Sequence, residues 1–452
     1  MQNTKLNILI YPMFSVDNMN ADSNYIIIKQ LCNELIKTDN YNFFLILDSN
    51  RKYYQDDIDK NIKIIKMPFP RGKKHQVIHF NTNIIREIFK KYAIDIVWNN
   101  VVERGHHFKY FQDTLLEKSR MKVFNYHHYV IHRSLEHLTS YLPCKHIMLD
   151  QIIGSMTVDI NYFHTQHCYN MLMEEAEDIL NKKQLKLLKD TCKVEIGGYC
   201  NRIETDEKYH MYTFIYNHRL DGYKNWKNTF EMFDRLYEKY TFKVIVTAGD
   251  KGNLGAIENK PYVEIKSFSL HSDYLKELSK CHANVINSRH ETFCISVAES
   301  IMNDQLVIAP NKVTFPELVD KNYPYLFNNE EEQYEIIAKL LQDNIREYKY
   351  KESNKLLLET HATKIDKLFM SLRQEDEYGD VFNKIKKQTT KVKIQEYVAK
   401  HSVIDLTEFK NYIFRLGYAS QSFPMTKIKR ILNELGYTYN INMDKYCRNG
   451  TK

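Results

Sequence analysis

Glu291 and Glu299 stand eight positions apart, the first just ahead of an apolar helix and the second inside it. Residues 283–287 form a short mixed run, and residues 295–302 have the apolar spacing of a helix, so Glu291 falls on a strand-to-helix loop. Such loops form ligand sites in open α/β sheets, because free backbone N–H groups and the positive helix end attract a diphosphate. Carboxylates on either side accept hydrogen bonds from vicinal hydroxyls. We therefore predict a sugar-nucleotide site, with Glu291 on the sugar hydroxyls and Glu299 on the ribose.

The residues around these carboxylates resemble the donor-site signature of the family-four retaining glycosyltransferases, over roughly residues 195–345. The matching residues are Glu291, Thr292, Phe293, Cys294, Glu299, Val307–Pro310 and Phe315–Leu318. In that family the pattern runs Glu, any residue, Phe, Gly, apolar residues, a second Glu, a strand, and a loop with Pro-Glu. This chain departs from it at Cys294, where Gly is usual. A Cβ there narrows the space beside the sugar, so the departure affects which hexose is bound.

A second loop carries two candidate cations. Residues 213–219 read as a strand that enters a polar loop, Lys224 follows five positions after Arg219, and a helix is expected from about Asn228 to Tyr240. An Arg and a Lys in a loop are most often plain surface charges. The resemblance implies instead that Arg219 and Lys224 hold the donor diphosphate, where two fixed cations would neutralise charge on the leaving group.

Strand and helix patterns alternate along the chain, which favours parallel sheets covered by helices. The expected strands are Leu6–Tyr11, Phe43–Leu47, Ile94–Trp98 and Val123–Tyr126, then Phe242–Gly249, Val263–Ser267 and Ala283–Ile286. The first helix should begin at a cap formed by Asp22 or Ser23. The resemblance implies the GT-B fold, an α/β architecture of two Rossmann-like domains facing a cleft. We place the acceptor-side domain at 1–195 and the nucleotide-sugar domain at 196–375, with a linker at 196–199.

In this architecture the first domain holds the acceptor on loops at the carboxyl ends of its strands. Those loops are rich in histidine, and each single His is more often a hydrogen-bonding residue than a catalyst. The preferred exception is His127 or His128, because similar enzymes place a His after this strand that reaches the transferred sugar. The histidine spacings match no zinc pattern, and the resemblance implies an enzyme that needs neither a metal nor another cofactor.

Composition favours a cytoplasmic enzyme. The chain has 452 residues, 43% of them hydrophobic, and no apolar run of membrane-spanning length. Residues 1–7 lead directly into a strand instead of forming a signal peptide. The eight cysteines lie at positions 32, 144, 168, 192, 200, 281, 294 and 447, without paired two-residue spacing. Neither a zinc site nor a disulfide framework is therefore expected.

The last part of the chain is strongly basic. Residues 381–452 contain 14 Lys and Arg against 5 Asp and Glu, a net charge of +9, whereas residues 1–380 carry −2. Apolar periodicity predicts three short helices and then a strand at 437–441, a small helix-turn-helix or winged-helix-like module. On the exposed side of the third helix we place Lys427, Lys429, Arg430 and Asn433, facing nucleic acid. Docking on anionic lipid and a plain solvated surface are the alternatives.

A second resemblance concerns the acceptor. Short blocks at 216–219, 224–225, 290–293, 314–317 and 325–327 are similar to the tRNA-queuosine mannosyltransferases, and bacteriophage enzymes that add glucose to hydroxymethylated pyrimidines in DNA share the fold. We therefore expect a retaining transfer of hexose, glucose from UDP-glucose, to a hydroxyl of a modified base in DNA. A tRNA base, a cell-surface glycan or a lipid-linked sugar are the alternative acceptors. A nucleic-acid-binding protein with an inactive core is disfavoured because all four donor-site residues are present.

Overall fold

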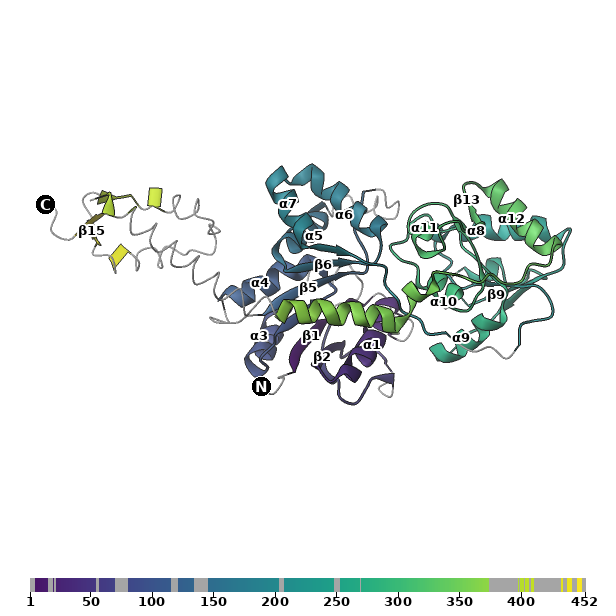
Figure 1. The fold of residues 1–452 in the computed structure, drawn as a ribbon, viewed down its shortest axis with the longest axis horizontal. Helices are drawn as coiled ribbons and strands as arrows, with labels where there is room; N and C mark the ends of the chain where they lie inside the picture. Colours follow the sequence, from purple (N-terminus) through teal and green to yellow (C-terminus); the bar gives the residue numbers. More distant parts are fainter. Residues whose placement is uncertain are drawn as a thin grey trace. The chain divides into compact units, whose positions relative to one another are not determined.

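The computed structural model describes residues 5–14, 19, 22–53, 57–69, 80–114, 121–133, 145–202, 207–247, 253–268 and 270–373, and shorter stretches between 397 and 448. The chain divides into two compact units, Met1–Lys367 and Leu368–Lys452. The first unit contains two separate parallel sheets, each flanked by helices (Figure 1). Among the described helices, none combines the length and the apolar character needed to cross a bilayer.

Seven described strands form the first sheet, in the order β3-β2-β1-β4-β5-β6-β7, and all of its pairs are parallel. Its strands are β1 (Leu6–Tyr11), β2 (Tyr41–Asp48), β3 (Lys63–Met67), β4 (Ile96–Asn99), β5 (Lys122–His127), β6 (Ile160–Phe163) and β7 (Cys192–Val194). Strand order reverses between β1 and β4, where Ile8 pairs with Ile96. The residues of β1 are almost all buried, as expected for a central strand covered on both faces.

The second sheet repeats this order, β10-β9-β8-β11-β12-β13, again with parallel pairs among its six described strands. Its strands are β8 (Thr213–Tyr216), β9 (Lys243–Val246), β10 (Val263–Ile265), β11 (Ala283–Val285), β12 (Leu306–Pro310) and β13 (Leu326–Phe327). The order reverses between β8 and β11. Ligands of open α/β sheets bind at such a switch point, beyond the carboxyl ends of the strands.

Helices alternate with these strands, so the predicted α/β fold with two Rossmann-like sheets is confirmed. The first sheet is accompanied by α1 (Ser23–Leu35), α3 (Thr82–Lys91), α4 (Gly105–Thr114), α5 (Lys145–Thr157), α6 (Gln166–Ile179) and α7 (Lys182–Thr191). The second is accompanied by α8 (Trp226–Tyr237), α9 (His271–Lys280), α10 (Ile295–Met302), α11 (Phe315–Leu318) and α12 (Glu330–Gln342). The side chain of Asp22 caps α1 by accepting from the N–H groups of Asn24 and Tyr25, one of the two caps predicted.

The chain crosses from the first sheet to the second after β7 and returns before a helix at 358–373. The two crossings lie side by side, since Cys200 and Leu357 form an isolated parallel bridge and the Leu358 N–H donates to the Cys200 carbonyl at 3.1 Å. Gly198 is required at this contact, because a Cβ there would lie 2.1 Å from the Leu357 carbonyl oxygen. After the return, Tyr41 donates to Asp366, which ties the helix at 358–373 to β2.

A buried polar cluster joins the crossings to the first sheet. The Tyr126 hydroxyl lies 2.7 Å from the Tyr199 hydroxyl and 3.0 Å from His361 Nε2, and the Tyr199 hydroxyl lies 2.7 Å from His164 Nδ1. Burial holds the pKa values of His164 and His361 well below the usual range, so both rings are neutral. The cluster therefore holds the crossings in place without burying a net charge.

The second unit contains an antiparallel sheet, β14-β16-β15, formed by β14 (Val403–Ile404), β15 (Tyr437–Asn440) and β16 (Lys445–Arg448). The predicted strand at 437–441 thus corresponds to β15. The three predicted helices fall largely outside the described residues, as do Lys427, Lys429 and Arg430. Asn433 is described, and it is helical and exposed.

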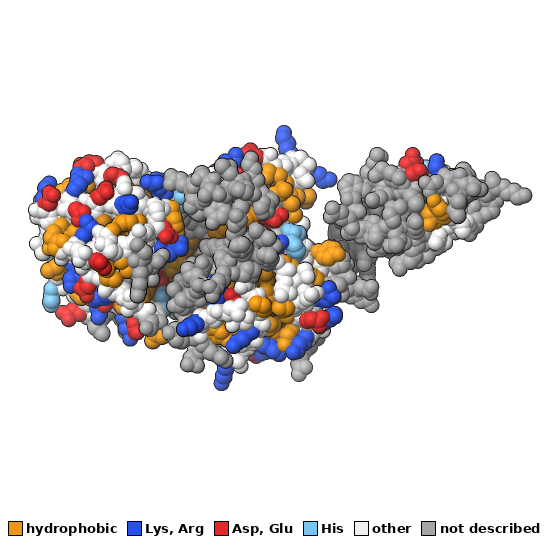
Figure 2. Space-filling model, turned by 180° about the vertical axis from the view of Figure 1, so that it is seen from behind, with side chains coloured by type: hydrophobic (Ala, Val, Ile, Leu, Met, Phe, Trp, Pro, Cys, Tyr) orange, Lys and Arg blue, Asp and Glu red, His pale blue; other side chains and the backbone are white. Residues whose placement is uncertain are grey.

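Charge on the first unit is mixed. On the face drawn in Figure 2, basic and acidic side chains are interspersed over the described surface of residues 5–373, without a broad region of one sign. This agrees with the near balance of charges in residues 1–380. The excess positive charge of the chain belongs to residues 381–452.

Candidate active site

Two loops meet at the switch point of the second sheet. The loop after β8 carries Arg219 and Lys224, and the loop after the neighbouring strand β11 carries Glu291. Lys224 ends a short 3-10 turn before α8, and Glu291 precedes α10, as the strand-to-helix pattern predicts. Strand order therefore brings together residues that are far apart in the sequence.

Lys224 and Glu291 form an ion pair between the Lys224 Nζ and the Glu291 Oε1, and their side chains are only 11% and 12% exposed. Burial opposes the charged form of the lysine, but the adjacent carboxylate outweighs this effect and raises the pKa of Lys224 above its usual value. The lysine is therefore positively charged at neutral pH. A partly desolvated cation is the group that a diphosphate needs at this place in the fold.

Arg219 lies at the outer edge of the same loop. Its side chain is 52% exposed, and its Nη2 contacts the Asp221 Oδ2 at 3.2 Å and the Tyr223 hydroxyl at 2.8 Å. An exposed pair of this kind contributes little to stability. The guanidinium can therefore exchange Asp221 for a phosphate at small cost, and its role in diphosphate binding stays a prediction.

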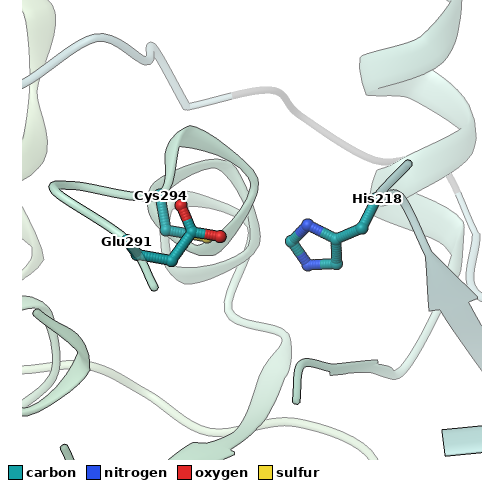
Figure 3. A group of neighbouring side chains, drawn as sticks. All are labelled: His218, Glu291 and Cys294. Carbon is teal, nitrogen blue, oxygen red and sulfur yellow. The ribbon is translucent and has the colours of Figure 1, made fainter. Parts of the chain in front are cut away.

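Cys294 occupies the position where the family-four retaining glycosyltransferases usually have glycine. The backbone conformation of Cys294 explains why glycine is favoured there. Its φ is 75° at the cap position of α10, in the left-handed region that side chains other than glycine rarely adopt. The Sγ lies 3.3 Å from the Ser296 hydroxyl, which also lies 3.3 Å from the His218 Nε2. In Figure 3 the His218 ring faces Glu291 and Cys294.

Glu299 points into the domain from α10 and is 4% exposed. Its Oε1 lies 2.8 Å from the His271 Nε2, and its Oε2 accepts from the Tyr274 hydroxyl at 2.8 Å, both from α9. Each carboxylate oxygen can accept a further hydrogen bond. The ribose contact predicted for Glu299 therefore requires it to share its oxygens with these two residues.

Thr292 and Phe293 connect the loop after β11 to the first half of the chain. The Thr292 hydroxyl donates to the His128 carbonyl and the Thr292 carbonyl accepts from the Thr165 hydroxyl, each at 2.7 Å. The Phe293 ring packs edge-on against Tyr199 with ring centroids 4.7 Å apart. Any change in the relative position of the two sheets must therefore act on the residues that follow Glu291.

A second bridge between the halves is formed by Glu317. Its carboxylate accepts from the N–H groups of Gln166 at 2.6 Å and His167 at 2.8 Å, at the start of α6. A carboxylate at a helix N-terminus is favourable because the first N–H groups lack partners within the helix.

The two candidate histidines of the first domain have different surroundings. His127 is fully buried, its Nε2 lies 3.0 Å from the Asn161 Oδ1, and its ring stacks on Phe163. Burial lowers the pKa of His127 to about 4, so the ring is neutral. His128 is 9% exposed, and its carbonyl accepts a hydrogen bond from Thr292 in the loop after β11. Of the two, His128 is the one adjacent to Thr292.

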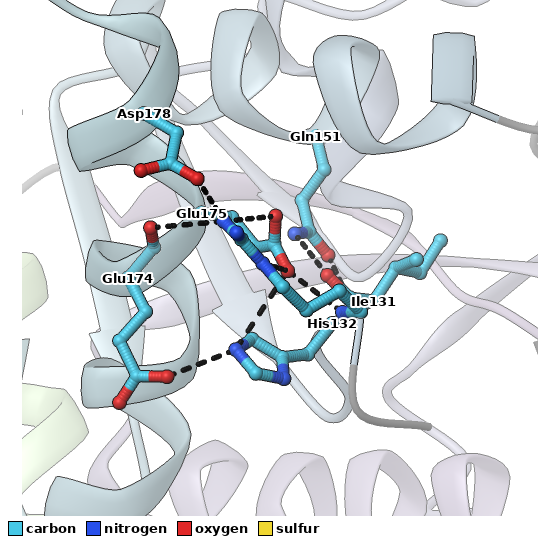
Figure 4. A network of polar contacts seen from close by, with 7 residues as sticks. Ile131, His132, Gln151, Glu174, Glu175 and Asp178 are labelled. Carbon is cyan, nitrogen blue, oxygen red and sulfur yellow. Dashed lines mark hydrogen bonds and ion pairs between the residues drawn. The ribbon is translucent and has the colours of Figure 1, made fainter. Parts of the chain in front are cut away.

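The segment after His128 is anchored by a polar network (Figure 4). The His132 Nε2 lies 3.0 Å from Glu174, the Gln151 side chain bonds the backbone of Ile131, and Arg133 pairs with Glu175 and Asp178. Glu175 is buried, and it accepts from both the backbone and the guanidinium of Arg133. These bonds hold the loop to α5 and α6.

A buried carboxylate lies at the carboxyl end of the first sheet. Glu103 is fully buried in a 3-10 turn after β4 and accepts from the Tyr129 hydroxyl at 2.7 Å. Burial raises the pKa of Glu103 to about 7. The carboxyl end of the first sheet therefore contains a carboxyl group that can hold or release a proton near neutral pH.

Several of these residues were given no role of their own from the sequence, although Glu317 belongs to the matched Pro-Glu loop. They are Thr165, His218, His271, Tyr274, Ser296 and Glu317, and each has a partner distant in the chain. His218 lies beside Arg219 in the predicted loop. This position is the one feature of the sequence that could have indicated His218 as a residue of the site.

Residues 201–356 match the family described as "Glycosyl transferases group 1". Solved structures share the fold over most of the chain. Sucrose-phosphate synthase from Thermosynechococcus elongatus is 13% identical with a TM-score of 0.60, covering 82% of this chain and 100% of its own. Anabaena HepE in complex with UDP and glucose is 12% identical with a TM-score of 0.58, covering 81% and 100%. A glycosyltransferase from Rickettsia africae is 16% identical with a TM-score of 0.55, covering 82% and 99%. No curated protein sequence matches significantly.

These likenesses and the two sheets define the fold as GT-B, as predicted. The family match covers the second sheet together with both loops of the candidate donor site, which includes Arg219, Lys224, Glu291 and Glu299.

Proposed function

We propose that the protein is a retaining glycosyltransferase that moves a hexose, glucose from UDP-glucose, onto an acceptor hydroxyl. The observation that carries the proposal is the buried Lys224–Glu291 pair at the switch point between β8 and β11, inside the segment that matches the glycosyltransferase family. Support for a UDP-linked donor comes from the fold, since Anabaena HepE has been solved with UDP-glucose. This likeness is one of fold alone.

In the proposed reaction Lys224 and Arg219 bind the diphosphate and stabilise the charge that develops when its bond to the sugar breaks. Glu291 accepts hydrogen bonds from sugar hydroxyls and fixes the orientation of the ring. The acceptor hydroxyl attacks from the face that the diphosphate leaves, and a diphosphate oxygen takes its proton. The sugar carbon thereby keeps its configuration without a protein nucleophile.

For the acceptor we propose a hydroxyl on a modified base of DNA. The support is the net charge of +9 in residues 381–452, because basic residues gathered in one part of a chain attract the phosphate backbone. A base inside a duplex cannot enter a cleft between two domains, so the target nucleotide is expected to flip out of the stack.

The test is to incubate the protein with radiolabelled UDP-glucose and, separately, hydroxymethylated DNA, unmodified DNA, bulk tRNA and membrane lipid. We expect label in hydroxymethylated DNA, and an α-linked product by NMR, since UDP-glucose is itself α-linked. Label in tRNA or lipid alone would replace the DNA acceptor, and a β-linked product would contradict retention.

Two lysine variants test whether Lys224 itself binds the donor or whether any positive charge near the site has the same effect. Lys224→Met should abolish transfer and weaken UDP binding, whereas Lys227→Met, three positions away on the exposed face of α8, should do neither. Circular dichroism of both variants establishes that they are folded. Equal activity in both would remove Lys224 from the donor site.

A further inference from the structure

The donor loops contain two side chains that the proposed transfer does not use, His218 and Cys294. Together with Glu291 they offer three atoms, one nitrogen, one oxygen and one sulfur, that all lie within 4.8 Å of one another (Figure 3). His218 and Cys294 are 6% and 8% exposed. Because the loops after β8 and β11 bring them together, their spacing in the sequence gives no zinc pattern.

We propose that His218, Glu291 and Cys294 form a binding site for one zinc ion, and that zinc bound there excludes the donor sugar. The exclusion rests on the proposed function, since it requires Glu291 to contact the sugar. Zinc binding itself does not depend on any transferase activity.

The ligand set favours zinc over the hard cations. Zinc is bound by Cys, His and carboxylate at about 2.0–2.3 Å, with ligand atoms about 3.3–3.8 Å apart in a tetrahedron. Small rotations of these three side chains would close the present separation. Magnesium and calcium need several oxygen ligands, whereas Glu291 supplies the oxygen here and the other two groups supply nitrogen and sulfur.

The protonation states can be followed through the binding step. Burial and the nearby Lys224 charge hold the pKa of His218 well below its usual value, so its ring is neutral and a lone pair is available. Burial raises the pKa of Cys294 to about 12, so the thiol holds its proton until the metal arrives. On binding, the S–H bond breaks, the S–Zn bond forms, and one proton passes to solvent.

Charge balance explains why the ion pair does not prevent binding. The zinc ion carries two positive charges, and Glu291 and the Cys294 thiolate together carry two negative charges. Lys224 then remains as the single excess charge, and it can keep its bond to the Glu291 Oε1 while zinc binds the other carboxylate oxygen.

The first experiment measures zinc alone. The full-length reduced protein is titrated with zinc chloride by calorimetry in two buffers of different ionisation enthalpy, and with cobalt(II) by absorbance. We expect one equivalent bound, release of about one proton, and the near-ultraviolet band of a cobalt thiolate. The variants are Cys294→Gly, which suits the positive φ, and His218→Gln, with Cys192→Ser as the control for loss of a half-buried thiol elsewhere.

Cys294→Gly and His218→Gln should each lose more affinity for zinc than the roughly 10- to 100-fold that removal of an outer-shell group costs, and Cys294→Gly should lose the cobalt band. Cys192→Ser should bind like the unaltered protein. Unchanged affinity in the two variants, or the absence of any zinc binding, would overturn the proposal.

The second experiment measures whether bound zinc excludes the donor sugar. Zinc at ten times its dissociation constant should weaken UDP-glucose binding about elevenfold in the unaltered protein, and the same zinc concentration should leave UDP-glucose binding to Cys294→Gly unchanged. If UDP-glucose does not bind at all, the proposed function fails while the zinc titrations still stand. If UDP-glucose binds equally well with and without zinc, the exclusion is wrong.

Discussion

Glu291 contributes both to the proposed reaction and to the local charge balance, because it is the ion-pair partner of buried Lys224. A Glu291→Ala change should lower turnover by about ten- to a hundredfold, the worth of a charged hydrogen bond of roughly 1.5–3 kcal/mol, and affect UDP affinity far less. Steady-state kinetics and UDP calorimetry measure the two effects.

The ion pair adds a consequence for stability. Removing one partner of a buried pair leaves the other charge uncompensated, so Glu291→Ala should also lower the thermal midpoint. The matched control is Glu331→Ala, whose partner Arg235 is half exposed and whose loss should have little effect. An unaltered midpoint in Glu291→Ala would contradict the observed pairing.

Glu103 should make stability depend on pH. Its pKa is raised from 4.5 to about 7 in the folded protein, so between these values the folded protein keeps a proton that the unfolded chain has released. This contribution is full below about pH 4.5 and is lost as the pH rises through 7, a change of roughly 3 kcal/mol. Between pH 5 and pH 8, the free energy of unfolding measured with urea should fall further in the unaltered protein than in Glu103→Gln, whose side chain does not titrate. If both proteins changed equally in their free energy of unfolding between pH 5 and pH 8, Glu103 would not be the source of the pH dependence.

For single residues, the sequence predicted which loops carry Lys224 and Glu291 but not their contacts. Lys224 and Glu291 were placed on the correct loops because a strand, a polar loop and an apolar helix leave a local pattern. The His218–Cys294 cluster leaves none, since it depends on β8 and β11 being neighbours in the sheet. The buried carboxyl of Glu103 was not predicted because burial is a property of the packed fold.

Among the elements, most strands were predicted, whereas β3 and β6 were not. The apolar runs of β1, β2 and β4 predict these strands directly, and their residues are mostly buried. β3 begins with Lys63 and is only partly buried, and β6 contains Asn161, whose side chain bonds across the sheet to Asn125. A polar residue in a buried strand is acceptable when a neighbouring strand supplies its partner, which a single sequence does not reveal.

The crossing between the sheets should tolerate no side chain at Gly198. A Cβ at this position would meet the Leu357 carbonyl oxygen at 2.1 Å, so Gly198→Ala must displace backbone and should cost about 1–3 kcal/mol. Gly222→Ala is the matched control, because nothing lies within 4 Å of a Cβ built there. Thermal unfolding of both variants measures the difference, and equal midpoints would mean that the two crossings do not touch.

For the whole molecule, the basic tail should govern affinity for DNA and not the chemistry. Deleting residues 381–452 should weaken binding to long DNA and flatten its salt dependence. Each phosphate contact contributes about 0.9 to the log-log slope, so the loss of three removes roughly 2.7. Transfer to a saturating short acceptor should survive, since Lys224 and Glu291 belong to Met1–Lys367. Filter binding at several salt concentrations gives the slope.

A triple change of Lys427, Lys429 and Arg430 to Glu provides a second route to the same result without shortening the chain. An unchanged salt slope in both proteins would exclude DNA contact by the tail. Binding of the unaltered protein to anionic vesicles in preference to DNA would direct the search to lipid-linked or cell-surface acceptors.

The architecture of two parallel sheets in Met1–Lys367 was predictable because alternating strands and helices extend over hundreds of residues. A pattern that repeats over many elements outweighs errors in single ones. The order of strands in each sheet was not predictable. It follows from the handedness of the connections and from which faces pack together.

The side-by-side crossings at Cys200 and Leu357 also determine how a long molecule could reach the space between the sheets. The backbone connects the two sheets through these two adjacent crossings, so the covalent chain closes no ring around a substrate held between the sheets. If the proposed DNA acceptor binds there, no free end of the DNA has to be threaded through. Circular and linear DNA should then be modified at equal rates per target base.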